Sequence, residues 1–354
     1  MASTEASHQP VSWFRGFYAA GVVPWVGRAL VVLLFVWLGI NLAKTPGDFG
    51  ILLIEGVTLG LVYGLIALGY SLVYGILELI NFAHGDVFML GSWMSLYIGV
   101  QKLGLDESSS GFKVIWGLAL TLLCAMAFCG LLNASIERVA YRPLRNAPRL
   151  APLITAIGMS FILQDVGLKQ LGSAPVSLPN ILPTGTVFTI GGNKYGWDHM
   201  IVAISALPVL ALLVWLVQRT RQGRGMRATA QDQEAAAMMG INVNGTIWFT
   251  FMIAGALAGV AGLLYALYST NIQYDQGFTL GLIAFTSAVL GGIGNLPGAV
   301  LGAIIIGLIQ QFNEGLSWHS PGSDWTQSIV FAILILILVF RPEGLLGERT
   351  PEGG

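Results

Sequence analysis

The chain contains one polar segment whose residue types suit docking onto another protein. Residues 219–241 begin with an arginine cluster and end in an alanine-rich stretch, Glu234-Ala235-Ala236-x-x-x-Gly240. Small alanine side chains allow close approach, charged side chains fix the register of a contact, and a glycine can end a helix in the left-handed conformation. We therefore predict a short coupling helix that ends at this glycine. The residues assigned to coupling are Arg224, Arg227, Asp232, Glu234, Ala235, Ala236 and Gly240.

A second segment, 75–91, places polar groups inside apolar sequence. Glu78, Asn81 and His84 are spaced by three residues, so they share one face if the helix is continuous. Such groups are costly in lipid and usually face an interior cavity or a partner, and Gly85 permits a break after them. These four residues could line a translocation path or gate, or they could form a polar cytoplasmic turn between two spans. A turn or a gate is favoured over direct contact with a substrate.

A third segment, 284–298, holds four glycines and a proline. Such a composition predicts a helix broken at or near membrane depth, whose free backbone ends could bind the polar groups of an amino acid. A tight glycine-packed hairpin explains the pattern equally well. The path or gate residues predicted from this segment are Thr286, Gly291, Gly292 and Gly294.

Motifs for ATP hydrolysis and for metal binding are absent from the sequence. It has no G-x-x-x-x-G-K-[ST] loop, no H-E-x-x-H and no paired cysteine spacing, and its four histidines are scattered. We therefore expect a chain that is not an enzyme and that binds no cofactor or metal itself. Any transport would be driven by an ion gradient, by a partner subunit, or by no energy source at all.

The composition indicates that lipid is the solvent for most of the chain. Of 354 residues, 55% are hydrophobic and only 10% are charged, whereas soluble proteins have about 25% charged residues. The net charge of −1 gives no indication of nucleic-acid binding.

The chain contains about ten apolar segments that could each cross a bilayer, since one crossing takes about 20 residues. The predicted class is an all-α polytopic membrane protein with about 8–10 transmembrane helices, some of them glycine-broken or re-entrant. Glycines at four-residue spacing, as at Gly56 and Gly60 or at Gly255 and Gly259, are interpreted as packing faces. The predicted spans are 29–43, 51–74, 86–101, 114–136, 151–171, 199–217, 246–269, 279–295, 298–313 and 326–340.

The distribution of arginine predicts the orientation. Loops 137–150 and 218–245 are rich in arginine, whereas 102–113 and 172–198 are nearly balanced in charge. Positively charged loops favour the cytoplasm, so the first two loops are expected inside and the other two outside. With ten spans, both termini are then cytoplasmic.

Together these segments resemble the branched-chain amino acid ABC transporter permeases, specifically the first of two paired permease subunits. The resemblance runs from about Glu55 to Gly347, so residues 1–46 are interpreted as an N-terminal extension with an added hydrophobic helix. Residues 47–347 would be a single permease domain with the coupling loop 218–245, and 348–354 a short tail. The motifs on which the resemblance rests are Gly56-Val-Thr-Leu-Gly60, Asn81-Phe-Ala-His-Gly85, Glu137-Arg-Val-Ala-Tyr-Arg-Pro143, Ala156-Ile-Gly-Met-Ser160, Gly223-Arg224, Leu290-Gly-Gly-Ile-Gly294 and Arg341-Pro-Glu-Gly344.

The resemblance implies an ABC importer permease fold in a bacterial or archaeal plasma membrane. It further implies a second permease subunit, two cytoplasmic ATP-binding subunits that hold ATP and magnesium, and an extracytoplasmic substrate-binding protein. The Glu-Ala-Ala pattern would mark the helix, within 228–241, that docks onto an ATP-binding subunit, although the second half of the family's pattern is missing here.

Two alternatives to an importer of leucine, isoleucine and valine remain. Permeases for urea and short amides share this architecture. A stand-alone carrier driven by an ion gradient would need acids inside the membrane, and only Glu55, Glu78, Asp86 and Asp165 lie near predicted spans.

Overall fold

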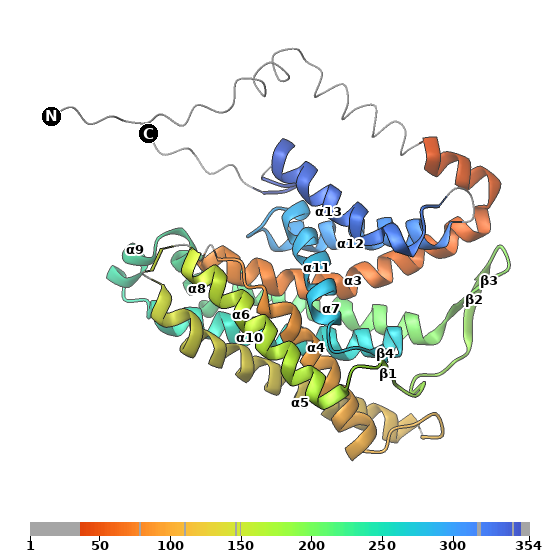
Figure 1. Ribbon diagram of the computed structural model, residues 1–354, viewed down its shortest axis with the longest axis horizontal. Coiled ribbons are helices and arrows are strands. Elements are labelled where there is room, and N and C mark those ends of the chain that lie inside the picture. The colour runs from red at the N-terminus through yellow and green to blue at the C-terminus, as the bar shows by residue number, and fades with distance from the viewer. Residues whose placement is uncertain are drawn as a thin grey trace, which may run out of the picture.

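The computed structural model describes residues 36–77, 79–109, 111–145, 147–148, 150–316, 320–341 and 343–347. Residues 36–44 are helical, and the rest of the predicted N-terminal span, Glu78 and the tail 348–354 lie outside the described residues. Figure 1 shows a bundle of long helices with two small strand pairs at one end. The helices are α3 (Pro46–Leu77), α4 (Ala83–Ser95), α5 (Gly111–Ile136), α6 (Leu150–Leu171), α7 (Trp197–Arg219), α8 (Arg221–Gln231), α9 (Gln233–Met238), α10 (Val243–Ser269), α11 (Gln276–Gly291), α12 (Leu296–Gly315) and α13 (Ser323–Phe340).

Three short helical turns extend this set. A π-helical turn, Leu96–Lys102, continues α4, and a second one, Glu137–Tyr141, continues α5 into the 3-10 turn Arg142–Leu144. The strands form two antiparallel pairs, β1 (Val176–Ser177) with β4 (Asn271–Ile272), and β2 (Thr186–Ile190) with β3 (Asn193–Gly196).

Nine of the ten predicted spans correspond to a described helix. In the described part of the chain, seven helices are long and apolar enough to cross a membrane: α3, α5 with its continuation, α6, α7, α10, α12 and α13. The other two, α4 and α11, are shorter and lie in the interior of the bundle, where nearly all their residues are buried. The prediction of an all-α polytopic protein is confirmed.

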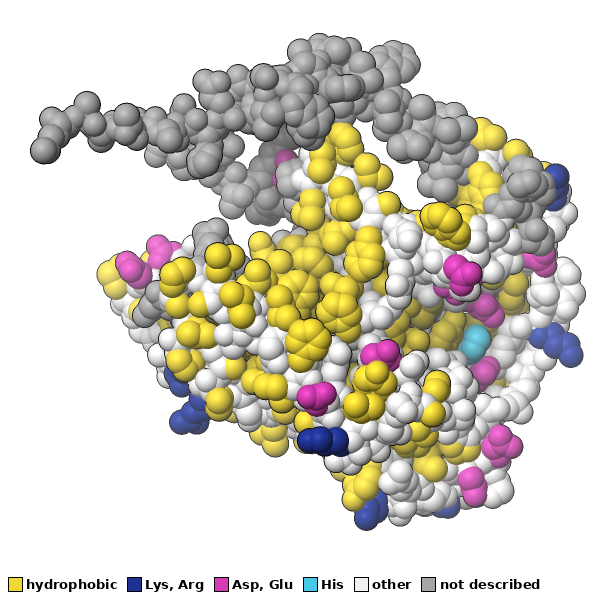
Figure 2. All heavy atoms as spheres, viewed as in Figure 1, with side chains coloured by type: hydrophobic (Ala, Val, Ile, Leu, Met, Phe, Trp, Pro, Cys, Tyr) yellow, Lys and Arg dark blue, Asp and Glu magenta, His cyan; other side chains and the backbone are white. Residues whose placement is uncertain are grey.

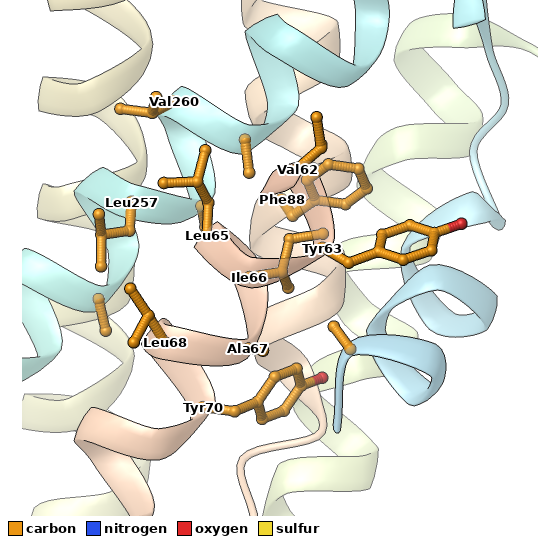
Figure 3. Packing of buried hydrophobic residues seen from close by; sticks show 14 of the residues in the cluster. Val62, Tyr63, Leu65, Ile66, Ala67, Leu68, Tyr70, Phe88, Leu257 and Val260 are labelled. Atoms are coloured by element: carbon orange, nitrogen blue, oxygen red, sulfur yellow. The ribbon is translucent and has the colours of Figure 1, made fainter. Parts of the chain in front are cut away.

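Helices α3 and α10 form the centre of the bundle. Figure 3 shows Val62, Leu65 and Ile66 of α3 packed with Phe88 of α4 and with Leu257 and Val260 of α10. The outer helices α5, α6, α7 and α13 instead present large exposed apolar side chains, such as Phe161, Leu212 and Ile335. Figure 2 shows the resulting broad apolar surface, with charged side chains toward its margins. Apolar residues both inside and outside are what a lipid environment requires.

Close backbone contact between helices depends on glycine. An added Cβ on Gly60 of α3 would lie 2.6 Å from the Cα of Ile304 in α12, and one on Gly56 would lie 2.9 Å from the Cα of Leu308. Gly255 and Gly259 of α10 press against the α5 backbone in the same way. These predicted packing faces are therefore confirmed. They allow helices to approach closely in lipid, where the hydrophobic effect does not drive helices together.

The helices run alternately between two ends of the bundle (Figure 1). One end, which we call the arginine end, holds the loops 137–149 and 218–245, and the Gln233 side chain there donates a hydrogen bond to the C=O of Ile76 at the end of α3. The opposite end, which we call the hairpin end, holds the β2–β3 hairpin, where Gly191 contacts Gly47 at the start of α3. Both arginine-rich loops thus lie together, as the charge distribution predicts.

A matched pair of glycine substitutions tests the packing of α3 on α12. Alanine in place of a helical glycine normally stabilises by about 0.4–1 kcal/mol, but Gly60→Ala should destabilise by about 1–3 kcal/mol because the two backbones must separate. Gly158 of α6, which has no atom within 4 Å of an added Cβ, provides the control. We expect the thermal midpoint in detergent to fall for Gly60→Ala and to hold or rise for Gly158→Ala. Equal thermal midpoints for the two variants would show that the close contact between α3 and α12 does not determine the stability of the protein.

Candidate functional site

The arginine end carries two helices that project from the bundle. Helix α8 begins at Thr220, whose hydroxyl accepts a hydrogen bond from the Gly223 amide at 3.1 Å. Arg227 donates to the C=O of Val217 and so ties α8 back to α7. Met226 of α8 is buried, whereas Arg224 is exposed. The polar first part of this loop is thus helical, which the sequence prediction missed.

Helix α9 is fixed at both ends by capping. The Asp232 carboxylate accepts hydrogen bonds from the amides of Glu234 and Ala235, each at 2.9 Å. At the other end Gly240 has φ +82°, its amide donates to Ala237, and the amide of Ile241 donates to Ala236, both at 3.0 Å. This is a Schellman cap. The prediction that a helix ends at Gly240 in the left-handed conformation is confirmed.

The coupling segment differs from prediction in one respect. The sequence predicted one helix within 228–241, but the chain is extended at Asp232, with φ −159° and ψ 113°, and two helices meet there. The break arises because the Asp232 side chain bonds to the amides that open α9 and so starts a new helix.

The outer face of α9 is exposed and partly apolar. Met238 and Met239 are each 82% exposed, and Glu234 is also exposed, whereas Ala236 is buried against the bundle. Methionine is flexible and polarisable and is frequent on protein-binding surfaces. A rigid, capped helix with two exposed methionines beside a carboxylate is suited to dock onto another protein.

The segment near Asn81 forms a turn between two spans, which is one of the alternatives that the sequence favoured. Helix α3 ends at Leu77 and α4 begins at Ala83, so Asn81 lies in the turn and shares no helical face with His84. The chain reverses direction between two antiparallel helices, which requires non-helical residues at this point. Gly85 lies within α4 and does not break it, and an added Cβ there would come within 3.0 Å of the α11 backbone.

His84 is an interior packing residue. Its ring is fully buried, lies edge-on to Tyr70 with centroids 4.8 Å apart, and occupies space that the absent side chain of Gly69 leaves free. Neither ring nitrogen has a hydrogen-bond partner among the described residues. In this conformation His84 does not line an open route.

Two motifs that are distant in sequence meet at this turn. The Tyr141 hydroxyl donates to the Asn81 side chain at 2.6 Å. One turn earlier, the buried Glu137 pairs with Arg145, which also donates to the Asn244 side chain at 2.7 Å and so links the end of α5 to the start of α10. Burial lowers the pKa of the Arg145 guanidinium, and the Glu137 carboxylate counteracts this change.

A buried acid was missed as a site residue by sequence reasoning. Asp86 in the first turn of α4 is fully buried and accepts a hydrogen bond from Ser160 of α6, to which Gln164 in turn donates at 3.1 Å. The signal was present in the polar segment that contains Asp86 and in the Ser160 motif, but nothing in the sequence joined the two. These contacts fix α4 against α6.

The glycine-rich segment forms the hairpin that the sequence left as an alternative. Helix α11 ends at Gly291 and α12 begins at Leu296. The free carbonyl groups are closed by the C-terminal segment 343–347, since the amides of Leu345 and Leu346 donate to Leu290 and Gly291 at 2.8 and 3.0 Å. Thr286 is buried and donates to Leu282 within its own helix. No open broken-helix site is therefore formed here by the described residues.

A small pocket at the arginine end brings the turn and the hairpin together. It lies between α3, the turn 79–82 and α11. Asn81 is the one predicted path residue on its wall, and the positions around Gly291–Gly294 contribute Ile293. The lining residues are Tyr70, Tyr74, Leu79, Ile80, Asn81, Phe285, Ala288 and Ile293.

Comparison with known proteins decides the family. A family model described as branched-chain amino acid transport system / permease component matches residues 52–339. The chain belongs to this family. The match runs from within α3 to within α13, so it includes the contacts described above except those of Gly47 and of residues 343–347.

Relatives of this permease cover most of its length. The high-affinity branched-chain amino acid transport system permease protein BraD of Pseudomonas aeruginosa is 40% identical over 85% of this chain and 96% of its own. The corresponding protein LivH of Escherichia coli is 40% identical over 84% of this chain and 95% of its own. The ribose import permease protein RbsC of Escherichia coli is 27% identical over 64% of this chain and 70% of its own. With seven long apolar helices among its described residues, this permease is a multi-pass membrane protein.

The ion pair at the arginine end can be tested by removing one partner. Arg145→Met leaves the Glu137 carboxylate buried without a counter-charge, which should cost roughly 3–5 kcal/mol of stability. Arg142→Met, three residues away and without a described ion pair, is the control. We expect the midpoint of denaturant unfolding in detergent to fall only for Arg145→Met. Equal effects of the two variants would show that the pair contributes nothing specific.

Proposed function

We propose that this permease is a subunit of an ATP-driven importer for leucine, isoleucine and valine. The observation that carries the proposal is the 40% identity, over more than four fifths of the chain, to permeases named for branched-chain amino acid transport. The more distant similarity to a ribose permease indicates that cargo can change within the wider fold. Cargo is therefore the part of the proposal that most needs a direct measurement.

The partners that we propose are a second permease, two ATP-binding subunits and an extracytoplasmic substrate-binding protein. ATP and magnesium would be bound by the ATP-binding subunits. Helix α9, capped by Asp232 and Gly240 and exposing Met238 and Met239, is the surface that we assign to contact with an ATP-binding subunit.

The proposed orientation places the arginine end in the cytoplasm. Arginine-rich loops are retained on the cytoplasmic side during insertion, and both of these loops lie at one end of the bundle with α9. The N-terminus is then also cytoplasmic if the predicted span 29–43 crosses the membrane.

The contacts of α8 and α9 offer a route for coupling. Gln233 at the start of α9 bonds to the C=O of Ile76 in α3 at 3.3 Å, and Arg227 of α8 bonds to the C=O of Val217 in α7. Movement of a docked ATP-binding subunit would therefore act directly on the ends of two membrane helices. One of these helices, α3, is the most buried of the long helices, so its displacement would be felt throughout the bundle.

Uptake of radiolabelled leucine into proteoliposomes tests this function. We expect uptake only when this chain is reconstituted with all its partners and with ATP on the side of the ATP-binding subunits. Glu234→Lys should leave assembly in the membrane intact but abolish uptake, because it reverses a charge on the docking face. Glu107→Lys, an exposed reversal at the hairpin end, should have no effect.

Two results would contradict the proposal. Leucine uptake by this chain alone, driven by an ion gradient, would instead support a stand-alone carrier. Full uptake by Glu234→Lys would remove the assignment of α9 to coupling. Competition by urea or ribose against labelled leucine would separate the cargo alternatives.

A further inference from the structure

A recess at the hairpin end gathers polar and aromatic side chains from four membrane helices. We call it the hairpin-end recess, and Figure 2 shows acidic side chains and a histidine around a hollow in this part of the surface. Its residues are Glu55 of α3, His199 of α7, Tyr268 of α10, and Gln311 and Glu314 of α12.

The distances show that these side chains form one cluster. His199 Nδ1 lies 3.7 Å from the Glu55 carboxylate, and the His199 ring lies 4.6 Å from that of Tyr268. The Gln311 amide donates to the Tyr268 hydroxyl at 3.1 Å. Glu314 lies three residues beyond Gln311 on α12, is exposed, and accepts a hydrogen bond from the Thr326 hydroxyl of α13 at 2.9 Å. Each of the four helices thus contributes one side chain or more to the same space.

The charge of the recess is negative and only partly balanced. Among the described residues, neither Glu55 nor Glu314 has a lysine or arginine partner. The basic group near Glu55 is His199, whose other ring nitrogen lies 3.9 Å from the Asp198 carboxylate. The side chains of Glu55 and His199 are 23% and 24% exposed, so both remain accessible. Ionisable groups within membrane helices are costly and usually mark a binding site or a pathway.

One wall of the recess is apolar. Tyr195, whose ring lies edge-on to that of His199 with centroids 6.0 Å apart, belongs to a small core with Leu52 and Phe312. Partly buried Ile54, Met200 and Leu308 pack against the same core. An aliphatic side chain could rest on this wall while a charged group reaches the carboxylates.

We propose that the hairpin-end recess binds the ammonium group of the amino acid cargo as it enters the permease. The Glu55 carboxylate supplies the opposite charge, Glu314 adds a second negative charge on α12, and the Tyr268 hydroxyl and the Gln311 amide are polar groups beside them. This inference rests on the proposed function, because it assumes amino acid cargo and an outward-facing hairpin end. Under this proposal the cargo is selected by a site within this chain as well as by the substrate-binding protein.

The test uses the complete importer in proteoliposomes and records two quantities together, leucine transported and ATP hydrolysed. Glu55→Gln combined with Glu314→Gln keeps the shape of both side chains and removes both charges. We expect leucine uptake to fall about tenfold, which corresponds to the loss of one hydrogen bond to a charged group. ATP hydrolysis stimulated by the loaded binding protein should persist in this double variant. Glu55→Asp, which keeps the charge, should retain more uptake than the double variant. Asp324→Asn, an exposed change at the same end of the bundle, is the control.

Each outcome is informative. Absence of leucine uptake by the unmodified importer would reject the proposed function and not the recess specifically. Normal uptake by the double variant would overturn the recess as a cargo site. A parallel fall of uptake and ATP hydrolysis would also overturn it, because it would indicate a structural role for the two carboxylates.

Discussion

Backbone contact between α3 and α12 is the constraint on which the rest of the structure depends. Gly56 and Gly60 leave no side chain between the two helices, and an added Cβ at either position would lie within 3.0 Å of the α12 backbone. In lipid, apolar side chains gain little by leaving their surroundings, so close packing must hold the helices together. With α3 fixed on α12, α10 and α11 pack against α3, and α4 is enclosed between them.

This packing connects two ends that have different chemistry. Helix α3 connects Glu55 in the hairpin-end recess to the Ile76 carbonyl that contacts α9, and these two residues are separated by about 32 Å along the helix axis. If α9 is the docking helix that we propose, α3 would link that helix mechanically to the polar recess. Close-packed interiors transmit displacement because they have little free volume.

The sequence predicted the parts of this structure that depend on local pattern. Apolar length located nine spans, and the glycine at 240 located the end of α9. It did not predict which distant side chains meet, as with Asn81 and Tyr141 or Asp86 and Ser160, because the spacing within one segment holds no information about its neighbour. For a related reason the three-residue spacing of Asn81 and His84 left a common helical face and a polar turn as alternatives, and the structure has the turn between α3 and α4.

Thiol labelling in intact cells measures directly which side of the membrane each end of the bundle faces. In a chain with Cys124 and Cys129 replaced, Met238→Cys would place a thiol at the exposed tip of α9 and Ser108→Cys one in the loop at the hairpin end. We expect a membrane-impermeant maleimide added outside to label the thiol at 108 and to label the one at 238 only after the membrane is opened. External labelling at 238 would contradict both the docking role of α9 and the entry of cargo at the hairpin-end recess.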